Sequence, residues 1–266
     1  MSFTGTSIIQ NNAIAPISEQ RPTGIEKEVY EVFRVENKVA LYIDDHLKRF
    51  ENSLMKAQKT IPVSMDQLHD LIDWLIICNP IRDANIRLSL LPDGYFQAGF
   101  IRSNYPDAGM YEHGVLCLLT HQERENPSAK VFQAQMRQSA EVIRKERKAY
   151  ELLLVDRHGR ITEGSRSNIF FIKENRLITA PSELVLEGIM RSKVLELAAE
   201  ADISICFEAI HVDTLQSMEA AFITGTSPRI LPIRQIEQTT FQVNHPLMRQ
   251  LMGHLEQKIK KGNVKH

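Results

Sequence analysis

ITEGSRSNIFFIKENRLITAP (residues 161–181) and VLEGIMRSKVLELA (residues 185–198) together decide the fold. Residues Asn168–Lys173 and Arg176–Thr179 are apolar runs joined by a short polar turn, which is typical of a β-hairpin. Residues Gly188–Ala201 carry apolar side chains at helical spacing, so this segment predicts an amphipathic helix. Strands followed closely by a helix indicate a mixed α/β protein.

The segments around this stretch extend the same pattern. Before it we expect a strand at 115–120, a long helix from Lys130 to about Lys148, and a hairpin of 151–156 with 160–163. After it we expect strands at 203–207 and 220–224, further strand segments through Gln242, and a last helix from Pro246. The second half of the chain is therefore predicted to be rich in strands, with several helices.

The first 105 residues predict a smaller unit. Residues 29–35 and 39–43 read as a hairpin, and Asp44-Asp45 opens a helix. A second helix follows Ser64, which forms a capping box with Gln67. Strands are expected at 85–90 and 95–101, giving the order ββααββ. Residues 1–23 are polar and are expected to be irregular.

Two domains follow from this order of elements. We expect a small N-terminal α/β domain at 1–105, a linker at 106–112 that is rich in turn-forming residues, and a larger domain at 113–266. Small-molecule sites are common in clefts between domains, so a cleft is the expected place for a site.

Composition narrows the function classes. The net charge of −1 does not favour a nucleic-acid or membrane partner, and the nine histidines show no HExxH or other metal-ligand spacing. The three cysteines are scattered through apolar stretches, as expected for a reducing compartment. The N-terminus lacks the features of a signal peptide, and no apolar run is long enough to span a bilayer. These observations predict a soluble cytoplasmic protein without a metal.

Three segments could carry chemistry. Gly188 at a helix start leaves backbone amides open to an anion such as a phosphate. Residues 224–228, Thr-Gly-Thr-Ser-Pro, follow an apolar strand and could form an anion cradle or an ordinary turn. Glu163 precedes an apolar strand and is either a buried carboxylate that needs a cationic partner or a surface residue.

In this order the segments resemble the class IV aminotransferases, a family that includes D-amino acid aminotransferase, branched-chain aminotransferase and aminodeoxychorismate lyase. The resemblance covers about residues 29–233. It rests on VYEVFRV with DDHLKRFENSL near the N-terminus, on the two stretches quoted first, and on FITGTSPRILPI at residues 222–233. It implies a fold-type-IV enzyme that binds pyridoxal 5′-phosphate between two domains, and a homodimer.

The resemblance also implies roles for individual residues. Lys130, about 20 residues before Tyr150, matches the lysine that carries the cofactor. Glu163 matches the acid on the pyridine nitrogen, and Tyr30 matches an aromatic residue of the substrate pocket. The residues that match cofactor-phosphate ligands are Arg49, Ile189, Met190 and Thr226, with the adjacent Ser227.

The sequence departs from the family pattern on the substrate side. Glu26-Lys27-Glu28 replaces the usual Gly-Asp-Gly, and Val131-Phe132-Gln133 follows the lysine. Met190, Arg229 and Leu231 also differ from common family residues. Candidates for binding the substrate carboxylate are Arg87, Arg102 and Arg124.

Three functions therefore stay open. The first is an aminotransferase acting on branched-chain or D-amino acids with a 2-oxo acid. The second is aminodeoxychorismate lyase, which releases 4-aminobenzoate and pyruvate. The third is a cofactor-binding relative without turnover.

Overall fold

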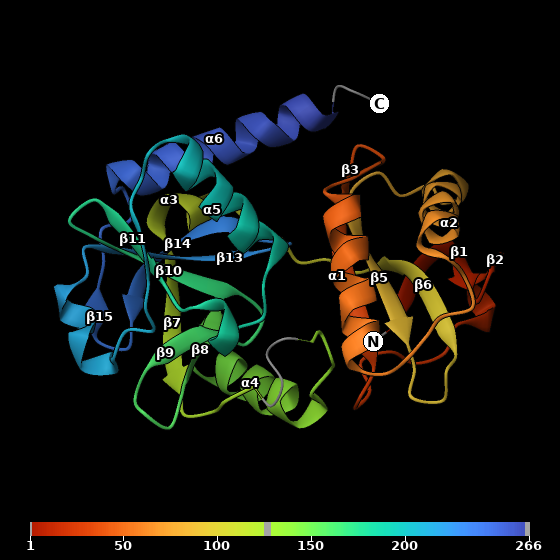
Figure 1. Ribbon diagram of the computed structural model, residues 1–266, viewed down its shortest axis with the longest axis horizontal. Coiled ribbons are helices and arrows are strands. Elements are labelled where there is room, and N and C mark those ends of the chain that lie inside the picture. Colours follow the sequence, from red (N-terminus) through yellow and green to blue (C-terminus); the bar gives the residue numbers. More distant parts are fainter. Residues whose placement is uncertain (1, 125–128, 264–266) are drawn as a thin grey trace. The chain divides into compact units, whose positions relative to one another are not determined.

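The computed structural model describes residues 2–124 and 129–263. These residues form two compact units. Among these residues, unit 1 contains 2–104 and 129–135, and unit 2 contains 105–124 and 136–263. Each unit combines a sheet with helices (Figure 1), so the predicted α/β class is confirmed.

Unit 1 is built on a six-stranded sheet in the order β2-β1-β6-β5-β3-β4, in which every pair is antiparallel. The strands are β1 (Phe3–Gln10), β2 (Ala13–Pro16), β3 (Val29–Glu36), β4 (Val39–Ala40), β5 (Ala84–Leu90) and β6 (Phe96–Ile101). Helices α1 (Ile43–Lys56) and α2 (Met65–Cys78) share one apolar core with alternate residues of β3 and β5. That core occupies one face of the sheet, since alternate strand residues point to the same side.

The two helices form where the sequence predicts them. In α1 the buried Leu47, Phe50 and Leu54 keep helical spacing, and two aspartates in the first turn favour the positive end of the helix dipole. The capping box of α2 is confirmed, because Ser64 and Gln67 bond each other's backbone amides.

The expectation that residues 1–23 are irregular is wrong. β1 and β2 form a hairpin through residues 11–12, and Asn11 adopts a positive φ of 52° that suits asparagine in a tight turn. Phe3, Ile8 and Ile9 are buried. The pairing of β1 with β6 shifts register between Thr4 and Ile9, so the alternation that would have revealed this strand is interrupted.

Unit 2 is built on a nine-stranded sheet in the order β12-β11-β10-β13-β14-β7-β8-β9, with β15 paired to β14. It mixes parallel and antiparallel pairs. Its strands are β7 (Val115–Thr120), β8 (Glu151–Val155), β9 (Ile161–Gly164), β10 (Asn168–Lys173), β11 (Arg176–Thr179), β12 (Ile205–Phe207), β13 (Ala220–Gly225), β14 (Arg229–Ile236) and β15 (Thr239–Thr240).

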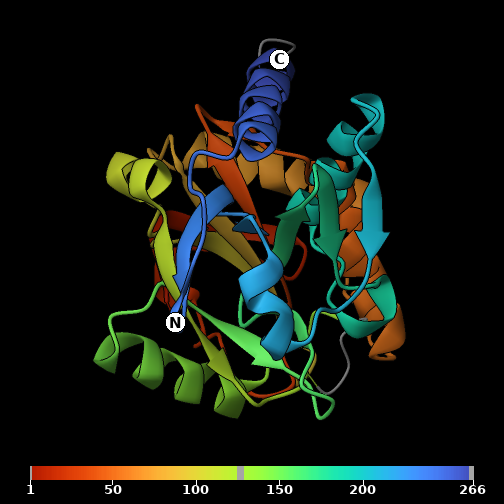
Figure 2. The same cartoon turned by 90° about the vertical axis from the view of Figure 1, so that its left-hand side faces the viewer.

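The helices of unit 2 are α3 (Ala108–His113), α4 (Ala134–Glu146), α5 (Ile189–Glu200) and α6 (Pro246–Asn263). Helices α4 and α6 lie at opposite ends of the unit, and α5 packs against α6 (Figures 1 and 2). α3 begins inside the segment expected to be a linker, with Asp107 as its N-cap. Short 3-10 turns complete the chain at Ile17–Glu19, Ser182–Leu184 and Val212–Ser217.

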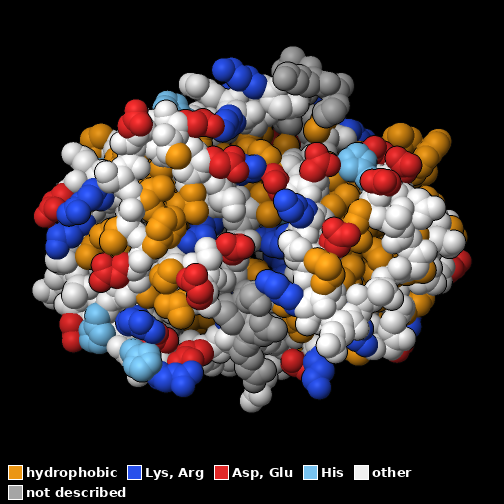
Figure 3. Space-filling model, in the orientation of Figure 1, with side chains coloured by type: hydrophobic (Ala, Val, Ile, Leu, Met, Phe, Trp, Pro, Cys, Tyr) orange, Lys and Arg blue, Asp and Glu red, His pale blue; other side chains and the backbone are white. Residues whose placement is uncertain are grey.

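Basic and acidic side chains are interspersed over the face drawn in Figure 3, in keeping with a net charge near zero. Within residues 2–124 and 129–263, every helix is too short or too polar to cross a bilayer.

Candidate cofactor and substrate site

The segment that carries Lys130 is fixed along the edge of β3. The backbone amide of Phe132 donates to the carbonyl of Glu28 at 2.8 Å, and the backbone amide of Tyr30 donates to the carbonyl of Lys130 at 3.2 Å. The backbone amide of Lys130 also donates to Oγ of Ser53 on α1, at 3.1 Å. This segment therefore belongs to unit 1, and α4 begins only at Ala134 rather than directly after the lysine.

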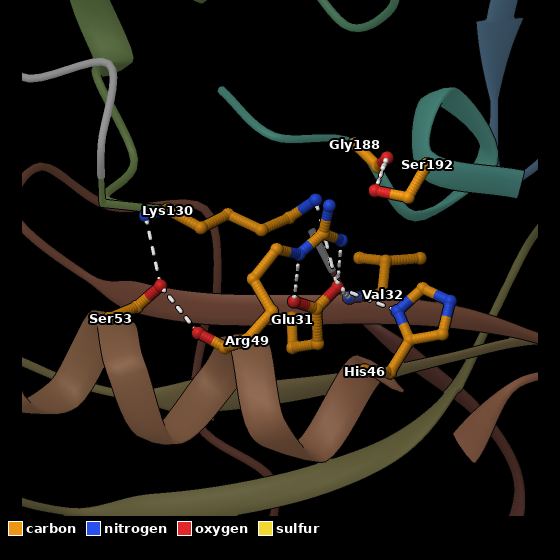
Figure 4. Close-up of polar contacts among 8 residues, drawn as sticks. All are labelled: Glu31, Val32, His46, Arg49, Ser53, Lys130, Gly188 and Ser192. Carbon is orange, nitrogen blue, oxygen red and sulfur yellow. Dashed lines mark hydrogen bonds and ion pairs between the residues drawn. The ribbon is translucent and has the colours of Figure 1, made fainter. Parts of the chain in front are cut away.

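Three side chains converge on the carboxylate of Glu31 (Figure 4). Arg49 donates from Nε and Nη2 at 2.8 and 2.6 Å, which makes a bidentate ion pair. Nδ1 of His46 lies 3.1 Å away and Nζ of Lys130 lies 3.6 Å away. The structure thus brings Lys130 and Arg49 together on one buried anion.

Burial and charge compete at this cluster. Glu31 is fully buried, which raises the pKa of its carboxyl, but the positive charges of Arg49 and Lys130 outweigh burial and hold the pKa well below its usual range. Burial lowers the pKa of His46, against the opposing effect of Glu31. At neutral pH the cluster therefore holds an ionised Glu31 with a neutral His46.

Sequence reasoning missed Glu31, His46 and Ser53. A signal was present, because Glu31 interrupts the apolar strand VYEVFRV. His46, Arg49 and Ser53 also recur at intervals that place polar groups on one face of α1. A buried carboxylate needs hydrogen-bonding or charged partners, and the polar face of α1 supplies them as His46 and Arg49.

The ring of Tyr30 lies close to two cations. Its ring centroid is 5.3 Å from Nζ of Lys130 and 4.2 Å from the guanidinium carbon of Arg87. The ring of Phe132 meets it edge-on at 5.7 Å. The aromatic ring of Tyr30 therefore lies beside the side chain of Lys130.

In unit 2, Glu163 lies in β9 and is buried. Nε of Arg124 donates to its Oε1 at 2.7 Å, and the backbone amide of Leu186 donates to its Oε2 at 3.3 Å. Burial raises the pKa of Glu163 and Arg124 opposes that rise. The reading of Glu163 as a surface residue is wrong, and its expected need for a cationic partner is confirmed by Arg124.

The start of α5 is open to an anion. Gly188 is its N-cap and no side chain caps the helix, so the first backbone amides, which include those of Ile189 and Met190, have no capping side chain. Oδ1 of Asn168 lies where a Cβ on Gly188 would stand, at 2.1 Å, so only glycine fits there. Asn168 also donates from Nδ2 to the carbonyl of Leu186 at 2.8 Å.

The same asparagine connects α5 to the second candidate anion site. Asn168 pairs with Thr224 across β10 and β13, and Thr226 and Ser227 occupy the turn that follows β13. Oγ1 of Thr224 is buried and has no hydrogen-bond partner among the described residues. Open helix amides, turn hydroxyls and an unsatisfied buried hydroxyl fit a phosphate group.

The turn between β9 and β10 is held by a carboxylate that the sequence reasoning also missed. Glu151 is buried and accepts hydrogen bonds from Oγ of Ser165 at 2.6 Å and of Ser167 at 2.9 Å. It thereby fixes the turn between Glu163 and Asn168.

The three arginines proposed for the substrate carboxylate differ. Arg87 is buried in an ion pair with Glu28, and Arg124 is buried in an ion pair with Glu163. Arg102 is exposed. Both buried candidates therefore already bind a carboxylate of this chain.

Comparisons with known proteins place the chain in a family. Residues 28–236 match the family described as amino-transferase class IV. The D-alanine aminotransferase of Bacillus licheniformis is 26% identical over 242 residues, 82% of each chain. A putative branched-chain-amino-acid aminotransferase of Methanocaldococcus jannaschii is 25% identical over 249 residues, 87% of this chain and 85% of the relative.

Solved structures show the same fold. The branched-chain amino acid aminotransferase of Escherichia coli superposes with a TM-score of 0.85 at 20% identity, covering 96% of this chain and 95% of the other. A putative 4-amino-4-deoxychorismate lyase from Legionella pneumophila superposes with a TM-score of 0.80 at 19% identity, covering 90% and 97%.

Proposed function

Because this chain belongs to the class IV aminotransferases, a family of pyridoxal-phosphate enzymes, we propose that it moves an amino group between an amino acid and a 2-oxo acid, with Lys130 carrying the cofactor. Branched-chain and D-amino acids are the substrate classes proposed. The observation that carries this proposal is the convergence of Lys130 and Arg49 on the buried carboxylate of Glu31.

Lys130 has the position that such a residue needs. Its backbone is held at the edge of β3 and its Nζ is restrained by Glu31, so the amine is presented in a fixed place. An amine held in this way can remove and return the proton on the substrate α-carbon as a general base. Bound pyridoxal phosphate supplies the electron sink that makes this proton acidic.

Two groups of residues are suited to the cofactor phosphate. Arg49 offers a guanidinium whose orientation is set by Glu31. Ile189, Met190, Thr226 and Ser227 offer backbone amides and hydroxyls at the open start of α5 and in the turn after β13. Contacts at the phosphate would anchor the cofactor without touching the reacting carbon, and would leave the proton transfer to Lys130.

Glu163 is suited to the pyridine nitrogen. It is a buried carboxyl whose orientation is fixed by the Leu186 amide and by Arg124. A carboxylate beside the ring nitrogen keeps that nitrogen protonated, which strengthens electron withdrawal.

The test is spectroscopic. We expect the purified protein to be yellow with pyridoxal phosphate, and Lys130→Ala to lose the absorption of the lysine-bound cofactor. Lys145→Ala is the matched control, because this lysine has an exposed side chain on α4. An unchanged Lys130→Ala spectrum would exclude Lys130 from the role.

A panel of L- and D-amino acids then separates the functions. Conversion of the cofactor to the pyridoxamine form supports the aminotransferase. Release of pyruvate from aminodeoxychorismate, without conversion of the cofactor by amino acids, would instead identify the protein as the lyase. A yellow protein that responds to neither is a cofactor-binding relative without turnover.

A further inference from the structure

A group of polar side chains is buried on the face of the unit 1 sheet that α1 and α2 do not cover. Tyr30 lies opposite Ser89 in the register of β3 with β5, and Ser89 lies opposite Gln97 in β6. Arg87 is two residues from Ser89 on β5 and so points to the same side. Glu28, Arg87, Ser89 and Gln97 are each at most 2% exposed. Charged groups are rarely buried this deeply unless they are paired.

Glu28 and Arg87 form a closed pair. Arg87 donates from Nε and Nη2 to Oε1 of Glu28 at 3.0 and 2.7 Å, and Ser89 donates to the same oxygen at 2.5 Å. Oε2 accepts from the backbone amides of Gly24 at 2.5 Å and Ile25 at 3.1 Å. All of the carboxylate's acceptor capacity is used, and the charge of Arg87 is balanced within the chain.

This pair adjoins the reactive lysine. The ring of Tyr30 lies close to both cations, with the guanidinium carbon of Arg87 at 4.2 Å and Nζ of Lys130 at 5.3 Å from its centroid. The ring of Phe132, two residues after the lysine, lies 5.4 Å from the same guanidinium carbon. An arginine that shares an aromatic neighbour with the lysine would attract a second carboxylate of a substrate if no other carboxylate held it.

We propose that Glu28 determines substrate specificity by occupying Arg87 in place of a substrate carboxylate. The inference rests on the proposed function and narrows its substrate class to amino acids with uncharged side chains. A dicarboxylic substrate has to displace Glu28 and break its five hydrogen bonds. An uncharged side chain meets the rings of Tyr30 and Phe132 without disturbing the pair. The same reasoning disfavours aminodeoxychorismate, which carries two carboxylates.

The experiment compares two acids that lack an amino group, 4-methylpentanoate and glutarate. Their binding to the cofactor-loaded protein is measured by calorimetry, so no turnover is required. We expect the wild-type protein to bind 4-methylpentanoate at least ~10-fold more tightly than glutarate. Glu28→Gln frees the charge of Arg87 and is expected to reduce that ratio ~10-fold or more, because a charge-assisted hydrogen bond becomes available to glutarate.

Glu36→Gln is the matched control. It makes the same change on β3 at the end remote from Glu28, where Glu36 pairs with the partly exposed Arg34, and it should leave the ratio unchanged. If Glu28→Gln does not fold, Ser89→Ala removes one hydrogen bond from Glu28 and should reduce the ratio in the same direction by a smaller factor.

Equal binding of the two acids by the wild type, or binding of neither, overturns the proposal. A folded Glu28→Gln protein with the wild-type ratio also overturns it. Failure of the proposed function gives a different result. In that case no amino acid converts the wild-type cofactor to its pyridoxamine form, regardless of how tightly the two acids bind.

Discussion

Glu31→Gln is nearly isosteric, and we expect it to lower the free energy of unfolding substantially. It removes the charge that Arg49 and Lys130 share, while keeping the size of the side chain. Removing one partner of a buried ion pair costs roughly 3–5 kcal/mol, because the remaining charge is left buried. The side chains of Arg49 and Lys130 are 12% and 13% exposed, so water compensates in part and we expect a loss of about 3 kcal/mol at neutral pH.

The assay is equilibrium unfolding in urea, followed by circular dichroism on the cofactor-free protein. Glu174→Gln serves as the control, since Glu174 and Arg176 form a well-exposed pair, 64% and 56%, whose loss should cost well under about 1 kcal/mol. Repeating both measurements in acid adds a second criterion. The folded pKa of Glu31 is lowered, so its contribution is complete above the unfolded pKa of about 4.3 and is lost as pH falls through the folded value.

The wild type and Glu31→Gln should therefore differ at pH 7 and converge in strong acid. A loss below about 1 kcal/mol at pH 7 would show that Glu31 does not balance the two cations. A difference that stays constant down to the acid limit would show that its origin is packing rather than charge.

Two further changes test the phosphate end of the site. Gly188→Ala places a Cβ 2.1 Å from Oδ1 of Asn168, and displacing that side chain should cost about 2 kcal/mol and weaken binding of pyridoxal phosphate in equilibrium dialysis. Gly253→Ala on α6 meets no atom within 4 Å and should instead stabilise the protein by about 0.5–1 kcal/mol, so equal effects of the two would refute the steric argument. Glu151→Gln replaces a carboxylate that accepts two serine hydroxyls and should cost about 1–3 kcal/mol in urea unfolding; the Glu174→Gln protein is again the reference.

Local signals predicted most of the fold. The capping box at Ser64 and the apolar spacing of α1 act within one or two turns of helix, and both helices form as predicted. The N-terminal hairpin was missed because a register shift after Thr4 interrupts its alternation, and its burial depends on β6, which is distant in sequence. The pairing of β1 with β6 cannot be recognised from the residues of β1 alone.

In the candidate site too, some residues could be predicted from the sequence and others depend on tertiary contacts. Lys130, Arg49 and Tyr30 were placed by resemblance. The structure brings Lys130 and Arg49 together at Glu31, with the ring of Tyr30 beside Lys130. Their roles stay predictions, as does the homodimer. Glu31 was not recognised, and Glu28 was noted only as part of a departure from the family pattern, because a glutamate becomes significant only when it is buried among cations. Burial of that kind is a property of the tertiary structure.

Residues 129–135, which include Lys130, belong to unit 1 although residues on both sides of them in the sequence belong to unit 2. The chain leaves unit 1 after residue 104, belongs to it again at residues 129–135 and then leaves it a second time, so no single cut separates the two units. The hydrogen bonds that clamp this segment to β3 and to Ser53 lie entirely within unit 1. Any movement of one unit against the other therefore moves Lys130 together with Arg49 and Glu31.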